Sequence, residues 1–582
     1  MNAANALAVS ETKTVSSVLL NILRKHNIRH IFGLPSAQLG LVMNGASSDQ
    51  WFRYITTRHE EAAGHMAHAT HLVTGEMAVC FGTVGPGATN LLPGVAAAWA
   101  DNIPMLVLTG NNQVNLIDPG RDLLQALDQI SLYRGVTKWS ATIRSAERAP
   151  ELIERALYIA RSGRPGPVHL DIPCDVGSWA CRYADGPAPI DPPRPVPAAT
   201  DVDRIARALR EARRPLLLAG GGVARSEATE RFRELARITG FPVATTPKAF
   251  GVAEFDGASL VGSAGFVSGP SVIRACQEAD VILAIGCKFS TWTPINKPPK
   301  YPMPISQKII QVDIDDSILG KAAPIWLGVV GDARETLAVI IEALGPTPRL
   351  SLDCGWSREL AAHQQAFRQT IDTIADERTT RGTNIANTAA LMREVARIAP
   401  ADAIFCIDGG QTMLWALTLL RPIDPAHVIF NAGMGHLGAG LPAANAAKMA
   451  QPDSTVILVS GDGATGCTVQ ELETTIRGGL KIVHIVFNDS HWGMYRPLGE
   501  MLFQNPRFGS KLTDVDFAAV ARGFGWQAER VSRLEEFGDA LRRALRASGS
   551  VLLDVDTDFT PHPMDQYLLD VIMDGVNLQA AL

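Results

Sequence analysis

One stretch constrains the fold of this chain more than any other. A buried apolar run at residues 455–460 enters the motif Gly461-Asp462-Gly463, and a helical pattern follows at 469–477. A second apolar run, 482–487, then leads into Asn488-Asp489. The periodicity predicts a strand, a glycine turn, a helix, a second strand and a second turn, which is the repeating unit of a parallel α/β sheet.

The two turns of this stretch have the residue types of a phosphate and metal site. Glycine lets backbone N–H groups approach a phosphate, and the N-terminus of the following helix adds a partial positive charge. We expect Asp462 and Asp489 at the carboxyl ends of adjacent parallel strands, where α/β sheets bind ligands. Two carboxylates there suit Mg2+ shared with a diphosphate. Gly-Asp-Gly alone is more often an ordinary turn, and the second acidic turn is what favours the metal site.

Composition excludes several classes of function. The length of 582 residues predicts several domains, and 46% apolar with 19% charged residues is typical of a protein with a large core. A net charge of −6 without a basic block argues against a nucleic-acid partner. The eight cysteines form no CxxC pair, so neither structural zinc nor a disulfide framework is expected. No apolar run reaches membrane-spanning length and residues 1–12 lack the order of a secretion signal, so no membrane partner and a cytoplasmic location are expected.

Strand and helix patterns divide the chain into three similar units. The predicted fold class is α/β, with three doubly wound parallel-sheet domains. Gly220-Gly221-Gly222 follows a strand of the second unit, where a phosphate contact and a tight strand-to-helix turn are equally good interpretations. The expected boundaries are an N-terminal domain at 1–183, a proline-rich linker at 184–199, a central domain at 200–345, a helix-prone connection at 346–384, a third domain at 385–560, and a lid or ordered tail at 561–582.

Several motifs in one order resemble a known family. They are Arg58-His59-Glu60-Glu61, Gly85-Pro86-Gly87-Ala88-Thr89-Asn90, Thr137-Lys138-Trp139, the loop around Gly435, and the two turns of the opening stretch. Together they resemble thiamine-diphosphate enzymes of the acetolactate synthase group, whose relatives include benzaldehyde lyase and 2-hydroxyacyl-CoA lyases. The resemblance implies pyrimidine-binding, central and diphosphate-binding domains. It also implies a homodimer or homotetramer whose active sites are shared between subunits.

The resemblance implies catalytic roles. Glu60 matches the glutamate that hydrogen-bonds the cofactor's pyrimidine ring and promotes loss of the thiazolium C2 proton; from sequence alone it fits a salt-bridged helix residue. Gly435 matches the residue whose carbonyl accepts the aminopyrimidine N–H, and Leu437 matches an apolar wedge that otherwise fits the core. Gln125 matches an active-site glutamine. Gln38 is a candidate donor to a substrate oxygen, or a solvated loop residue.

The resemblance also implies the metal ligands. These are the carboxylates of Asp462 and Asp489 and the backbone carbonyl of His491. Asp489 stands where many members have asparagine, and either side chain offers an oxygen to Mg2+. The other cofactor contacts it implies are Pro35, Gly85, Asn90, Gly410, Gln411, Thr412, Gly461, Gly463, Ala464, Trp492, Gly493 and Met494.

Departures from the family pattern bear on the substrate. Gln125-Ala126 replaces the His-His pair of simple decarboxylases, which favours carboligation or its reversal. Trp292 stands where biosynthetic acetolactate synthases have an arginine that holds the acceptor's carboxylate.

The leading hypothesis is an acetolactate-synthase-like carboligase acting on a 2-oxo acid such as pyruvate. The alternatives are a lyase that cleaves a 2-hydroxyacyl-CoA or an acyloin, and a catalytically silent cofactor-binding subunit. The substrate is expected to be a small 2-oxo acid, aldehyde or acyl-CoA.

The central domain keeps only part of a flavin signature. The matching residues are 262–268, Gly-Ser-Ala-Gly-Phe-Val-Ser. FAD, an ADP-like ligand and an empty site therefore all stay open for this domain.

Overall fold

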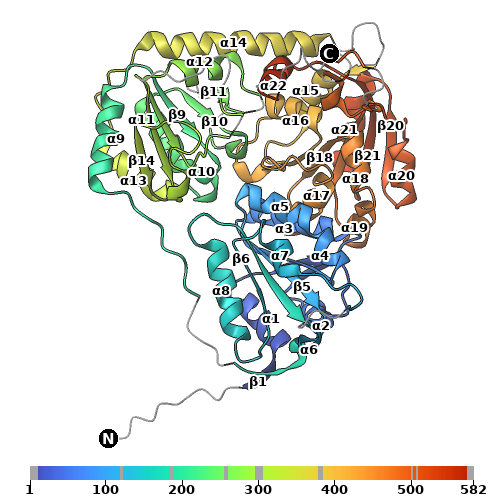
Figure 1. The fold of residues 1–582 in the computed structure, drawn as a ribbon. Coiled ribbons are helices and arrows are strands. Elements are labelled where there is room, and N and C mark those ends of the chain that lie inside the picture. Colours follow the sequence, from blue (N-terminus) through green and yellow to red (C-terminus); the bar gives the residue numbers. More distant parts are fainter. Residues whose placement is uncertain are drawn as a thin grey trace, which may run out of the picture.

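The chain folds around three twisted sheets, each covered by helices, in a computed structural model (Figure 1). The structure describes residues 11–117, 122–183, 189–253, 260–265, 267–290, 292–294, 306–377, 385–497, 499, 503–505 and 509–572. In Figure 1 the N-terminal unit lies at the bottom, and the central and third units lie side by side above it. The expected three-unit α/β fold is confirmed, whereas the domain boundaries stay a prediction.

The N-terminal unit is a six-stranded parallel sheet in the order β3-β2-β4-β5-β7-β6. Its strands are β2 (His30–Gly33), β3 (Arg53–Thr56), β4 (Ala78–Gly82), β5 (Met105–Asn111), β6 (Trp139–Thr142) and β7 (Pro167–Pro173). Its helices are α1 (Val15–Lys25), α2 (Gly40–Ser48), α3 (Glu60–Thr74), α4 (Pro86–Asn90), α5 (Leu92–Asp101), α6 (Val114–Ile117), α7 (Gln129–Tyr133) and α8 (Ala149–Arg161). A separate antiparallel pair joins β1 (Glu11–Thr14) to β8 (Ala180–Tyr183).

The central unit is also a six-stranded parallel sheet, in the order β11-β10-β9-β12-β13-β14. Its strands are β9 (Pro215–Ala219), β10 (Val243–Thr245), β11 (Leu260–Ser263), β12 (Val281–Ile285), β13 (Lys308–Asp313) and β14 (Leu327–Val330). Its helices are α9 (Ala199–Glu211), α10 (Gly221–Arg225), α11 (Thr229–Thr239), α12 (Pro270–Glu278) and α13 (Ala333–Leu344). The strand order reverses between β9 and β12, so the crevice beyond their carboxyl ends is a ligand position.

The third unit has the strand order β15-β21-β19-β18-β16-β17, with β20 paired to β21. Its strands are β15 (Ala386–Asn387), β16 (Ile404–Asp408), β17 (Val428–Ile429), β18 (Val456–Gly461), β19 (Val483–Asn488), β20 (Gln527–Val531) and β21 (Val551–Asp558). Its helices are α15 (Thr388–Ile398), α16 (Gly410–Leu419), α17 (Gly440–Ala450), α18 (Asp462–Cys467), α19 (Glu471–Arg477), α20 (Phe517–Gly523) and α21 (Leu534–Arg546). β18 and β19 pair in parallel, as the opening stretch predicts.

Two segments outside the three sheets contain helices. The connection after the central unit contains the long helix α14 (Cys354–Asp376), which buries Trp356 and Leu360 in the central core. The described part of the tail forms α22 (Asp565–Ile572), whose Tyr567 packs with Met564 against Trp292. The described part of the tail therefore packs against the central unit.

The N-terminal and third units share one apolar core. Met66 and Ala67 of α3 pack in the same cluster as Leu441 and Ala444 of α17. This contact fixes the start of α3 relative to the loop that precedes α17. Among the helices the structure describes, none has the combination of length and apolarity needed to cross a membrane.

Candidate functional site

Three turns of the third unit meet at one end of its sheet. They follow β16, β18 and β19, whose pairing places their carboxyl ends side by side. Gly409 has φ 94°, and a Cβ there would lie 3.2 Å from the backbone nitrogen of Gly461. A Cβ on Gly461 would lie 3.5 Å from Oγ1 of Thr412. The glycines thus keep side chains out of the space between the turns.

The two aspartates of the opening stretch lie together at these turns. The backbone N–H of Ser490 donates to the Asp462 carboxylate, and Asp489 Oδ1 accepts the N–H of His491 at 3.0 Å. Burial, with the neighbouring Asp489 charge, raises the pKa of Asp462 to about 7. Burial likewise raises the pKa of Asp489 to about 6. A cation bound beside the two carboxylates would favour the ionised form of both.

The remaining cofactor contacts predicted in the third unit line the same turns. A Cβ on Gly463 would lie 2.6 Å from the Trp492 ring. A Cβ on Gly410 would lie 2.8 Å from Cβ of Met494. Ala464 is buried, and Gly493 lies beside Asp489 and Gln411. The side-chain amide of Gln411 donates to the carbonyl of Thr560 at 3.0 Å, while its Cβ and Cγ lie against Gly493.

Asp408 is a buried carboxylate that the sequence analysis does not single out. Its side chain accepts the N–H groups of Gly440 and Gly409, both at 2.7 Å. Burial raises its pKa to about 6. It therefore joins the turn after β16 to the start of α17. Its position at the end of a strand before two glycines is the signal that could have identified it.

Glu60 occupies the first position of α3, where it is 3% exposed. Nδ2 of Asn90 donates to its Oε2 at 3.1 Å. A Cβ on Gly87 would lie 3.2 Å from Oε1, so a glycine leaves room on that side. The sequence motifs around 60 and 90 thus form one structural unit.

Gln38 lies beside Thr83 and Gly110, at the ends of two strands of the N-terminal sheet. Its Oε1 accepts from the hydroxyl of Thr83 at 2.7 Å and from that of Ser36 at 3.3 Å. These bonds turn the amide so that its Nε2 donor is directed away from both hydroxyls. The adjacent Pro35 is exposed.

Gln125 is exposed and has φ 63°, a left-handed conformation that is strained for a residue with a side chain. Its carbonyl oxygen lies against Gly85, where an added Cβ would come within 2.5 Å of it. The N–H of Gly85 donates to Oε1 of Gln129 at 3.1 Å. The structure therefore brings two separate predicted site residues, Gln125 and Gly85, into contact.

The N-terminal and third units meet beside these residues. The N–H of Arg58 donates to the buried carboxylate of Glu471 at 3.0 Å. Oε1 of Glu61 lies 3.5 Å from Nδ1 of His436, so the neighbours of Glu60 and Gly435 touch within one chain. Gly435 is exposed and has a φ of 63°. A Cβ on Gly435 would meet nothing within 4 Å. Leu437, two residues further on, is half-buried.

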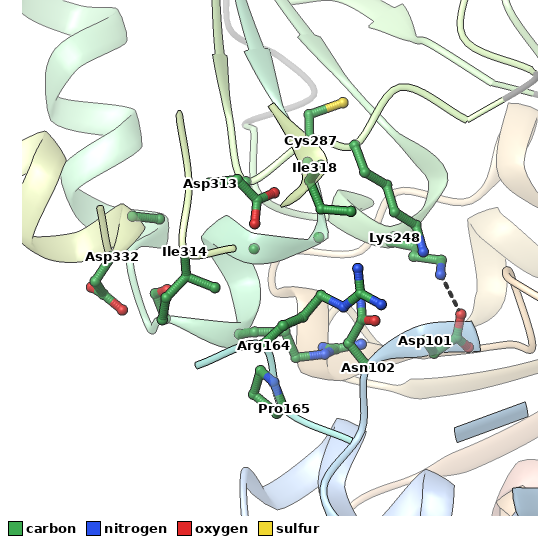
Figure 2. A pocket seen from close by; sticks show the side chains of 18 of the residues that line it. Asp101, Asn102, Arg164, Pro165, Lys248, Cys287, Asp313, Ile314, Ile318 and Asp332 are labelled. Atoms are coloured by element: carbon green, nitrogen blue, oxygen red, sulfur yellow. Dashed lines mark ion pairs between the residues drawn. The ribbon is translucent and has the colours of Figure 1, made fainter. Parts of the chain in front are cut away.

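A second cavity, of about 730 Å³, lies at the junction of the three units. Figure 2 shows Arg164, Asn102, Asp313 and Asp332 around it, and Lys248 is ion-paired to Asp101 at 2.6 Å. Gly220-Gly221-Gly222 and Gly286 line it at the β9–β12 crevice, while Trp292 also lines it. The partial flavin signature faces elsewhere: Gly262 and Ser263 line a smaller cavity of about 140 Å³, and Phe266 lies outside the described residues.

Three doubly wound units, a glycine-framed carboxylate pair and a buried glutamate define a class of α/β enzymes that bind a diphosphate-bearing cofactor. Three family models of thiamine pyrophosphate enzymes match the chain. The N-terminal TPP binding domain matches residues 13–132, the central domain residues 202–340, and the C-terminal TPP binding domain residues 408–555. The chain therefore belongs to the thiamine pyrophosphate enzyme family, in which it is an acetolactate-synthase-like carboligase.

Relatives match along nearly the whole chain. The probable acetolactate synthase large subunit of Methanocaldococcus jannaschii is 31% identical over 93% of this chain and 92% of its own. The acetolactate synthase large subunit of Corynebacterium glutamicum is 31% identical over 92% of this chain and 85% of its own. The acetolactate synthase isozyme 2 large subunit of Escherichia coli is 30% identical over 93% and 95%.

Proposed function

We propose that this enzyme joins a unit derived from a 2-oxo acid such as pyruvate to a second carbonyl compound, with Glu60 as its key catalytic residue. The observation that carries the proposal is the buried carboxylate of Glu60, fixed by Asn90. A carboxyl group enclosed in this way can share a proton with a ring nitrogen instead of exchanging it with water. The names of the relatives support the choice of a 2-oxo acid.

The residues fit thiamine diphosphate. The glycine turns leave a cradle that a Cβ would partly fill, and Gly435 faces open space. When bound, thiamine diphosphate supplies an acidic carbon next to an electron sink. Glu60 would hold a proton at the pyrimidine edge, the Gly435 carbonyl would accept from its amino group, and Leu437 would fix its bend. The Nε2 group of Gln38 would donate to a substrate oxygen, and Gln125 would border the same space.

Mg2+ fits the carboxylate pair. Asp462 and Asp489 offer hard oxygen ligands, and the carbonyl of His491 is proposed as a third. Burial raises the pKa of both aspartates, and the Asp489 charge adds to the rise at Asp462. A divalent ion bound with the diphosphate would favour the ionised form of both.

The second candidate is cleavage of a 2-hydroxyacyl-CoA or an acyloin. It is favoured by Trp292, which packs against α22 and offers no charge to an acceptor's carboxylate. Purified enzyme loaded with cofactor and Mg2+ separates the two. Pyruvate consumed with release of CO2 and formation of acetolactate supports the first proposal. Aldehyde released from a 2-hydroxyacyl substrate without CO2 supports the second, and neither reaction would contradict both.

We infer that the cavity at the junction of the three units takes the adenosine diphosphate portion that ADP and FAD share. It lies at the reversal point of strand order, is framed by glycines, and presents Asp313 and Asp332 as acceptors for ribose hydroxyls. Lys288 lies on its wall to offset phosphate charge, next to Lys248, which is paired with Asp101. Heat-released ligand analysed by chromatography and by absorbance near the flavin band distinguishes ADP, FAD and an empty cavity.

We also propose a homodimer or homotetramer with shared active sites. Leu41, Leu124 and Leu127 are exposed beside Gln38 and Gln125, Leu124 by 85%. Apolar side chains exposed around a site mark an interface. Leu124→Asp should lower the oligomer mass in light scattering, whereas an unchanged mass would contradict this interface.

A further inference from the structure

Three side chains with metal-ligand chemistry meet where α3 faces the loop ahead of α17. Glu61 and His65 are one helical turn apart on α3, so they lie on the same face. His436 comes from the loop. Oε1 of Glu61 lies 3.7 Å from Nε2 of His65 and 3.5 Å from Nδ1 of His436. The three ligand atoms all lie within 4.8 Å of one another.

The histidines of this cluster have unused nitrogens. His65 is 1% exposed, yet among the described residues neither of its ring nitrogens has a hydrogen-bond partner. Nδ1 of His436 also lacks one, and the two rings lie 5.1 Å apart at a tilt of 47°. Buried polar atoms are nearly always paired, so these nitrogens indicate a ligand.

The geometry suits a particular type of ion. Zn2+ binds nitrogen and carboxylate oxygen at about 2.0–2.2 Å, so two ligand atoms on a tetrahedral ion lie about 3.3–3.5 Å apart. Both distances from Glu61 are close to this separation, and the two histidine nitrogens lie within 4.8 Å of one another. Two imidazoles with one carboxylate form a donor set for Zn2+ and similar ions, whereas Mg2+ prefers oxygen alone.

We propose that Glu61, His65 and His436 bind a divalent transition cation, best matched by Zn2+, which ties α3 to the loop before α17. The ion keeps one open position for water. Because Glu61 adjoins Glu60 and His436 adjoins Gly435, the bound ion fixes the spacing between the N-terminal and third units within one chain, and with it the positions of the residues that this chain offers to the shared active sites.

Spectroscopy of the full-length enzyme tests the site with Co2+ as the probe. The protein is stripped of metals, reloaded with thiamine diphosphate and excess Mg2+, and then titrated with Co2+. We expect about one Co2+ per chain with the strong visible absorption of four-coordinate cobalt, displaced by Zn2+ and unaffected by more Mg2+. The unfolding midpoint should rise with Zn2+, because a ligand of the folded state stabilises it.

Variants decide whether these residues are the ligands. His436→Ala, at a half-buried loop position, and Glu61→Gln should each abolish the absorption and the Zn2+-dependent rise in midpoint, with circular dichroism showing an intact fold. The controls are His363→Ala on α14 and Asp462→Ala, and both should keep the Co2+ absorption. Asp462 is a control because its carboxylate belongs to the proposed Mg2+ site. A signal that survives His436→Ala, that disappears in Asp462→Ala, or that never forms would overturn the proposal.

Discussion

Nδ2 of Asn90 donates a hydrogen bond of 3.1 Å to Oε2 of Glu60, so the end of α4 fixes the carboxylate at the start of α3. Because Glu60 is buried, this bond determines which oxygen stays free for a cofactor. The pair joins two motifs that are thirty residues apart in the sequence. It also makes a graded test of the catalytic assignment feasible.

Glu60→Gln should bind thiamine diphosphate but slow hydrogen–deuterium exchange at C2 of the bound cofactor by about 10²–10⁴-fold, since the proton-sharing group is lost. Asn90→Ala should slow it less, by about 10–100-fold, because a hydrogen bond to a charged group is worth about 1.5–3 kcal/mol. Rapid-quench NMR measures both rates. Exchange in Glu60→Gln at the wild-type rate would refute the assignment.

Asp489→Asn should keep Mg2+-dependent cofactor binding, weaker by less than about tenfold, because an amide oxygen is still a ligand. It also removes the charge that helps raise the pKa of Asp462. Asp462→Ala should lose binding altogether. In the wild type, binding must displace protons from carboxyl groups whose pKa values are about 7 and 6, so the half-saturating Mg2+ concentration should rise as the pH falls below 7. Calorimetric titration checks all three, and a flat pH profile would argue against the pair as ligands.

Thr83→Val should lower kcat although Thr83 itself is not proposed to touch substrate. The change removes the hydroxyl that holds Oε1 of Gln38 at 2.7 Å, so the amide can rotate and its donor is no longer directed at one position. Loss of one neutral hydrogen bond predicts an effect of about tenfold. Steady-state kinetics measures it against Gln38→Ala, and the double variant should be no slower than Gln38→Ala if both act through the same amide.

The strands of the sheets were largely predictable from sequence. β9, β12 and β18 are continuous apolar runs, because both faces of a parallel sheet are covered. β21 is harder to predict although it lies inside the third sheet. It contains Asp554, which is fully buried and accepts hydrogen bonds from Asn488 and from the N–H of Phe517. In the sequence such a carboxylate is typical of a surface residue, because its partners Asn488 and Phe517 are distant along the chain.

The candidate site was predictable only in its local motifs. Glycine turns at strand ends reveal Gly461 and Asp462, because the turn and its chemistry lie within a few residues. Asp408 depends on the N–H of Gly440, and the orientation of Gln411 depends on the carbonyl of Thr560. The start of α15 at Thr388 depends on Asn387, which caps the helix by accepting from two backbone N–H groups. These features depend on geometry that sequence spacing does not contain.

Glu471→Ala should loosen the contact between the N-terminal and third units. Glu471 is fully buried and accepts from the N–H of Arg58 at 3.0 Å and the hydroxyl of Thr474 at 2.6 Å. Its removal leaves these donors unpaired and should cost about 2–4 kcal/mol. Glu471→Gln keeps an acceptor oxygen and should cost about 1 kcal/mol. Urea unfolding midpoints distinguish the two, and equal midpoints would show that the hydrogen bonds contribute little.

His169 should make the enzyme sensitive to acid. It is fully buried, lies 2.7 Å from the hydroxyls of Thr109 and Ser140, and burial lowers its pKa to about 3. In the unfolded chain the pKa is about 6.5, so the neutral imidazole contributes stability that is fully present above pH 6.5. Between pH 6.5 and pH 4 the unfolded state gains a proton that the folded state excludes, and about 3 kcal/mol is lost. His169→Asn should have a lower free energy of unfolding at pH 7, but that free energy should fall less on acidification than in the wild type. The control is His363→Ala, on the partly exposed face of α14, whose free energy of unfolding should follow the wild type. Denaturant unfolding at pH 7, 5.5 and 4 measures the difference, and parallel curves for wild type and His169→Asn would place the acid sensitivity elsewhere.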